Sequence, residues 1–99
     1  MTELEIARQQ INEVDRQMAE LFVRRMDAVR TVAEYKQKNG VRVTDLKREA
    51  EVIKKNSSLV LNEAIKPYYV SFLQNNMELS KAYQHRLLEG MRVAYSGVE

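Results

Sequence analysis

The sequence lacks cysteine and tryptophan, and it has only one proline, three glycines and one histidine in 99 residues. Without cysteine the chain has no disulfides and no thiol chemistry, which is typical of proteins from a reducing compartment. Turn-forming residues are scarce, and the residues most typical of strands are not grouped until residues 93–95. Ala, Leu, Glu, Lys, Arg and Gln are frequent instead, so the composition predicts an all-α fold.

Long hydrophobic runs are also missing. No stretch approaches the 18 apolar residues that a membrane-spanning helix needs, and the acidic N-terminus has neither the basic nor the apolar region of a signal peptide. We therefore expect a soluble, cytoplasmic protein without a membrane partner. The length and the hydrophobic content of 44% suit a single core.

Charge of one sign is not concentrated enough for nucleic-acid binding. The formal net charge is +2, and residues 1–39 hold seven basic and seven acidic residues. Only residues 42–55 have a basic excess, five against three. Proteins that bind nucleic acid normally have a continuous basic stripe, so we expect no nucleic-acid partner.

What the sequence does have is one long amphipathic pattern. Apolar residues recur alternately three and four apart over residues 4–35, which predicts a helix over residues 4–39 that ends at Gly40. Its length is about 54 Å at 1.5 Å per residue, whereas a compact domain of this size has a radius of gyration of about 13 Å. Two further helices are predicted over residues 45–56 and 67–89.

Neither later helix is long enough to cover the first one. We therefore expect an intertwined homodimer of three-helix protomers, in which the long helices cross and the later helices cover the partner's overhang.

Two cations interrupt the apolar pattern of the first helix. Arg25 occupies a seam position, and Lys36 falls on the same stripe. Removing such groups from water is costly unless an anion and hydrogen bonds compensate. Each therefore needs an acidic partner within the protein or an anionic ligand.

The other predicted helices also place polar groups on their apolar faces. Three charged residues open the second helix, and two polar residues lie one turn apart on the third; they are Asp45, Arg48, Glu49, Ser80 and Gln84. A purely structural explanation pairs Arg48 with Glu49 or Asp45, lets Arg25 meet one of these carboxylates, and leaves the two polar residues in the core. For each residue alone that explanation stays open.

Taken together, charged groups on three helices favour a ligand site. The excess of cations, without a nucleophile or a metal-binding cluster, suits a small polyanion. We expect neither a metal nor a cofactor. Arg8 lies about 17 residues and 25 Å from Arg25 along the helix, so it could reach the same point only from the partner of a crossed dimer.

The last nine residues have a different pattern. Arg92-Val93-Ala94-Tyr95 followed by Ser96-Gly97 predicts a short strand that enters a turn. An all-helical domain has nothing for such a strand to pair with. We therefore expect one domain over residues 1–90, and we expect residues 91–99 to be the truncated, disordered start of another.

The combined spacing resembles that of a known family. Arg25 follows another arginine, Lys36 comes eleven residues later, Asp45-x-x-Arg48-Glu49 opens a helix, and Ser80-x-x-x-Gln84 lies in the last one. Over residues 4–88 this resembles the all-helical chorismate mutase family. The tail is similar to the opening strand of a prephenate dehydratase domain, so the chain resembles the mutase part of a bifunctional chorismate mutase and prephenate dehydratase.

The resemblance implies an isomerase of aromatic amino-acid biosynthesis that converts chorismate to prephenate by a Claisen rearrangement, without a cofactor. It also implies an intertwined dimer with two equivalent sites. The substrate's two carboxylates would be held by cations of one protomer and by one arginine of the other; these are Arg25, Lys36 and Arg48, and Arg8.

The resemblance assigns the remaining roles as well. Ser80 would add a hydrogen bond to a carboxylate, and Glu49, helped by the backbone near Asp45, would hold the ring hydroxyl. Lys36 and Gln84 would donate to the ether oxygen. The implied catalytic residues are Arg25, Lys36 and Gln84.

Two alternatives belong to other functional classes. An isochorismate pyruvate lyase would share the fold and most of the cations, although the dehydratase-like tail favours the mutase. A non-enzymatic helical dimer that binds RNA or protein would need the long seam, but it would not need Arg25 and Lys36 within it.

Overall fold

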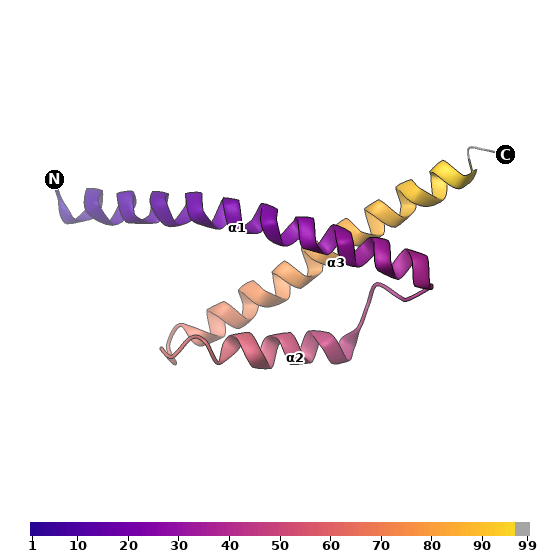
Figure 1. The fold of residues 1–99 in the computed structure, drawn as a ribbon. Coiled ribbons are helices and arrows are strands. Elements are labelled where there is room, and N and C mark those ends of the chain that lie inside the picture. The colour runs from indigo at the N-terminus through magenta and orange to yellow at the C-terminus, as the bar shows by residue number, and fades with distance from the viewer. Residues whose placement is uncertain (97–99) are drawn as a thin grey trace.

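The computed structural model describes the backbone of residues 1–96 and the side chains of residues 1–90. The fold consists of three helices, α1 (Glu3–Asn39), α2 (Leu46–Ser57) and α3 (Lys66–Ser96), without a strand in the described residues. Helices α1 and α3 cross, and α2 and the first part of α3 form an antiparallel pair (Figure 1). The predicted all-α fold with a very long first helix is confirmed.

Local signals set both ends of α1. The Thr2 side chain accepts a hydrogen bond of 3.1 Å from the Glu5 N–H, and acidic residues occupy the first turn. At the other end Gly40 adopts φ 64°, a left-handed conformation that favours glycine, and its N–H donates to the Lys36 carbonyl. The predicted bounds of this helix therefore agree with the structure to within one residue.

The second helix begins as its N-cap predicts, and the third runs farther than expected. Asp45 accepts a hydrogen bond of 3.0 Å from the Arg48 N–H. Pro67 lies in the first turn of α3, where its missing N–H costs no helical hydrogen bond.

The predicted strand at residues 92–95 is wrong, because α3 continues through these residues to Ser96. An isolated strand leaves its backbone N–H and C=O groups without partners, whereas each residue added to an existing helix gains one hydrogen bond. Residues 97–99 lie outside the described residues. The assignment of residues 91–99 to a second domain stays a prediction.

The core of one chain is small and lies where α1 and α3 cross. Its buried apolar side chains come from the second half of α1, from the α1–α2 connection and from α3; they are Val29, Ala33, Val43, Leu73 and Met77. Helix α2 has no buried residue. The chain has a radius of gyration of 17.8 Å and extends over 64 × 30 × 15 Å, well beyond the roughly 13 Å of a compact domain of this length.

The first half of α1 projects away from the other helices (Figure 1). Its seam side chains stay between 43% and 58% exposed; they are Leu4, Ile11, Val14, Met18 and Leu21. Within the part of the chain that the structure describes, no helix combines the length and apolarity needed to cross a membrane.

Candidate active site

A cavity of about 180 Å³ lies among the three helices near the crossing. Its wall includes seven of the eight residues predicted to form a site; these are Arg25, Lys36, Asp45, Arg48, Glu49, Ser80 and Gln84. Lys81 and five apolar residues complete the wall. We call this site the polar cavity. The fold therefore brings together residues that are up to 59 positions apart in the sequence.

Arg25 and Ser80 link α1 to α3 inside this cavity. The Arg25 guanidinium donates a hydrogen bond to Ser80 Oγ. Ser80 is buried, and its own hydroxyl donates to the Asn76 carbonyl at 2.8 Å. Because the Ser80 proton satisfies the backbone of α3, the hydroxyl oxygen is left to accept from Arg25, which sets the position of the guanidinium.

Lys36 is held by the connection that follows α1. Its Nζ donates to the carbonyl of buried Val43 at 2.8 Å. The turn at Gly40 reverses the chain and brings this carbonyl back toward the last turn of α1. An ammonium group has three donors, so Lys36 keeps two for a ligand.

The first turn of α2 contributes the acidic side of the cavity. Asp45 caps the helix, which places Arg48 and Glu49 in its first turn beside the cavity. Glu49 forms an ion pair of 2.8 Å with Lys81 of α3. The carboxylate of Glu49, and after it that of Glu78, raises the pKa of Lys81 above its usual value, so Lys81 is cationic at neutral pH.

The purely structural pairing of the cations is wrong. Among the side chains that the structure describes, no carboxylate forms an ion pair with Arg25, Lys36 or Arg48. Four cations and two carboxylates line the polar cavity, which gives it a formal charge of +2. Arg25 and Lys36 are half-buried without an acidic partner, which favours an anionic ligand, whereas Arg48 is exposed and Lys81 is paired with Glu49.

Gln84 adds a buried amide oxygen without a hydrogen-bond partner to the cations that lack an acidic partner. Its side chain is buried, with 6% of its surface exposed, and its Oε1 has no hydrogen-bond partner among the described residues. A buried polar group without a partner costs about 1–3 kcal/mol. The amide can present its oxygen or, by rotation, its NH₂ group to a ligand in the cavity.

Arg8 is the predicted site residue that the single chain does not bring to the cavity. It is exposed on the projecting half of α1 and is not part of the cavity wall. Along the helix it lies about 25 Å from Arg25.

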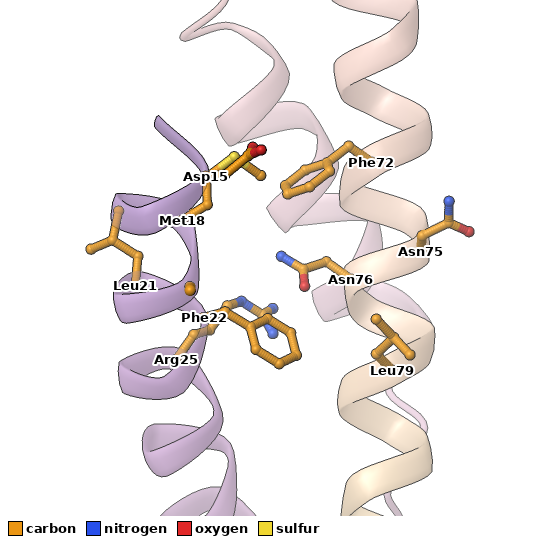
Figure 2. A pocket seen from close by; sticks show the side chains of 10 residues that line it. Asp15, Met18, Leu21, Phe22, Arg25, Phe72, Asn75, Asn76 and Leu79 are labelled. Atoms are coloured by element: carbon orange, nitrogen blue, oxygen red, sulfur yellow. The ribbon is translucent and has the colours of Figure 1, made fainter. Parts of the chain in front are cut away.

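A larger, apolar pocket of about 540 Å³ lies between α1 and α3. Phe22 and Arg25 extend into it from α1, and Phe72 and Asn76 extend from α3 (Figure 2). Among the described residues, Asp15 and Arg25 are the charged members of its wall. A dianion therefore suits the polar cavity better, despite the smaller volume. No group of three or more His, Cys, Asp or Glu side chains that could hold a metal ion occurs among the described residues.

Lys81 is the wall residue that the sequence reasoning missed. It directly follows Ser80 and precedes Gln84 by three positions, so the helical repeat places it on the edge of the same face. That spacing was the available signal. Lys81 did not stand out, because the chain has sixteen basic residues and the helix that contains it carries other charged residues.

Comparison with protein families gives a match. The family described as chorismate mutase type II matches residues 7–85. The chain belongs to this family. The match includes all eight predicted site residues, and membership in the chorismate mutase family makes the protein an isomerase with chorismate as its substrate. No curated protein and no solved structure matched the chain significantly.

Proposed function

We propose that the polar cavity binds chorismate and converts it to prephenate by charge complementarity and conformational restriction alone. The observation that carries this proposal is the gathering of three cations without acidic partners, beside an unsatisfied buried amide, in a cavity of formal charge +2. Chorismate is a dianion, so the cavity's charge complements that of its substrate.

The rearrangement needs little from the protein beyond position and charge. One C–O bond breaks while one C–C bond forms within the same molecule, so no proton transfer or covalent intermediate is required. The protein has to hold the side chain of chorismate folded over its ring and to stabilise negative charge on the ether oxygen as the C–O bond breaks.

The positions of the cations support the roles that the family resemblance implies. Arg25 and Arg48 line the cavity from α1 and α2 and would hold the carboxylates. Ser80, which contacts Arg25, would turn its hydroxyl proton from the Asn76 carbonyl to the same carboxylate when the substrate binds. Lys36 and Gln84 would donate to the ether oxygen, where the interaction strengthens in the transition state.

Glu49 supplies an acceptor for the ring hydroxyl in this proposal. A carboxylate accepts hydrogen bonds and repels the substrate's own carboxylates, so it would also orient the dianion within the cavity. The backbone at the start of α2, next to Asp45, would help Glu49 to hold this hydroxyl.

We also propose that two chains intertwine and that Arg8 of each serves the cavity of the other. The exposed seam of α1 and the radius of gyration of 17.8 Å support this, because a single chain leaves large apolar side chains in water. A fifth cation from the partner would strengthen the hold on the dianion.

The enzymatic proposal is tested by incubating the purified chain with chorismate in the presence of a chelator. We expect chorismate absorbance to fall while prephenate accumulates. A parallel incubation with isochorismate separates the alternative lyase, which would release pyruvate. Pyruvate release without prephenate formation would overturn the proposed rearrangement.

The shared site is tested by mixing two inactive variants. Arg8→Ala and Arg25→Ala homodimers each lack one cation in both sites, whereas a mixed dimer has one complete site. After joint refolding about half of the dimers are mixed, so about a quarter of wild-type activity should return. Unchanged activity despite proven mixed dimers would refute a contribution of Arg8 from the partner.

A role in the cytoplasmic synthesis of phenylalanine and tyrosine follows from the proposed product. Expression of the chain in a bacterial strain without chorismate mutase should restore growth without these two amino acids. Failure of an expressed, active protein to restore growth would refute this role.

A further inference from the structure

One ion pair connects two helices directly at the polar cavity. Lys81 Nζ of α3 lies 2.8 Å from Glu49 Oε1 of α2, and both side chains are only 20% exposed. Every other ion pair among the described side chains joins residues three or four positions apart. The Lys81–Glu49 contact is therefore the one ion pair between helices among the described side chains.

Helix α2 is held in place from one side only. It has no buried residue, and it packs against α3 but not against α1. Its first turn nevertheless carries Arg48 and Glu49 on the cavity wall. The position of two proposed substrate contacts thus depends on how firmly α2 is held against α3.

Lys81 is well placed to hold the first turn of α2. Its ammonium contacts Glu49 on one side and Glu78, at 2.8 Å, on the other. Glu78 belongs to α3 and is not part of the cavity wall, and its side chain is 69% exposed. The contact with Glu49 is thus the one that reaches the site.

We propose that Lys81 is a positioning residue of this enzyme, which holds the Glu49 carboxylate and the first turn of α2 in the geometry that binds the substrate. This inference rests on the proposed function of the polar cavity. Lys81 acts through Glu49, so its effect on the reaction disappears when Glu49 loses its charge.

The first test removes the charge of Lys81 and keeps the length of its side chain. Lys81→Met should lower kcat/KM about tenfold, the scale of a coupling between contacting charged groups. The loss should appear mainly as a higher KM, because the ring hydroxyl takes no part in the bonds that break and form, and its contact is already made before the transition state. Lys81→Arg should restore most of the activity.

The matched control is Glu78→Gln, which removes the other partner of Lys81. Its kcat/KM should stay within about twofold of wild type, because an exposed ion pair contributes little. Activity is measured well below the melting temperature of each variant, so that a purely structural loss lowers the melting temperature without changing KM. A normal KM in folded Lys81→Met would overturn the inference.

A double-mutant cycle with Glu49→Gln separates action through Glu49 from direct contact with the substrate. If Lys81 acts through Glu49, adding Lys81→Met to Glu49→Gln should cause no further loss of kcat/KM. If the two losses multiply, Lys81 acts independently of Glu49 and the inference is wrong. An inactive wild-type protein would refute the proposed function as well, whereas an active one with multiplying losses refutes this inference alone.

Discussion

The two halves of α1 carry the same apolar repeat but differ in what covers it. In the second half α3 covers one side of the helix, where Val29 and Ala33 are buried and Arg25 and Lys36 find hydrogen-bond partners. On the other side the repeat residues Val32 and Tyr35 stay 44% and 63% exposed. In the first half Leu4 and Ile11 stay more than half exposed. A helical pattern thus states which residues are suited to burial, and the elements packed against the helix decide which are buried.

The largest effect is expected for a substitution in the exposed first half of α1, because the proposed dimer would bury this half. We predict that Ile11→Ala, in the uncovered half, lowers the free energy of unfolding by about 2–5 kcal/mol, as a core substitution does. Leu73→Ala, in the buried core of one chain, is the reference variant. Both are measured by urea unfolding at several protein concentrations.

For a dimer, the unfolding midpoint should rise with protein concentration. If the first half of α1 is exposed in solution, Ile11→Ala should instead change the free energy of unfolding by less than about 0.5 kcal/mol. That outcome, together with an unfolding midpoint that does not depend on protein concentration, would show that the first half of α1 stays exposed in solution. It would refute the dimer.

At the covered half we predict that Arg25→Ala and Lys36→Ala each lower kcat/KM at least about a hundredfold, the scale of one lost preorganised charge contact. Circular dichroism should show an unchanged helix content. Arg24→Ala is the control, because Arg24 is exposed and outside the cavity wall. Wild-type activity in either cavity variant would remove that residue from the site.

The pH profile tests Gln84. Gln84→Glu should reduce kcat/KM at neutral pH about a hundredfold, since the introduced carboxylate repels negative charge on the ether oxygen. Activity should return as the pH falls and the carboxyl becomes protonated and able to donate. Gln74→Glu, on the exposed face of α3, should keep the wild-type profile. An unshifted profile for Gln84→Glu would exclude its contact with the ether oxygen.

The smallest effect concerns the N-cap of the uncovered half. Thr2→Ala should lower the free energy of unfolding by about 1 kcal/mol, because the Glu5 N–H loses its acceptor. Thr2→Asn retains a side-chain acceptor and should cost much less. Equal losses in both variants would show that the cap contributes through something other than this hydrogen bond.

Local chemistry was enough to predict most of the helical structure. The start of α2 at Asp45 and the end of α1 at Gly40 follow from backbone geometry and from side-chain hydrogen bonds within a few residues. The same local reasoning failed at residues 92–95, where strand-forming residues had no strand to pair with and α3 continued. Strand formation depends on a distant partner, and no pattern within the segment can supply one.

The sequence by itself determined the long amphipathic helix, its ends, and the anomalous cations that marked a site, because helical periodicity is a property of the chain alone. Only the tertiary structure decided the partners of those cations. It placed Ser80 beside Arg25 and the Val43 carbonyl beside Lys36, and it gave Glu49 to Lys81 instead of to Arg48. Such pairings depend on how helices far apart in sequence cross, and the distances that set their electrostatics exist only once the helices have packed.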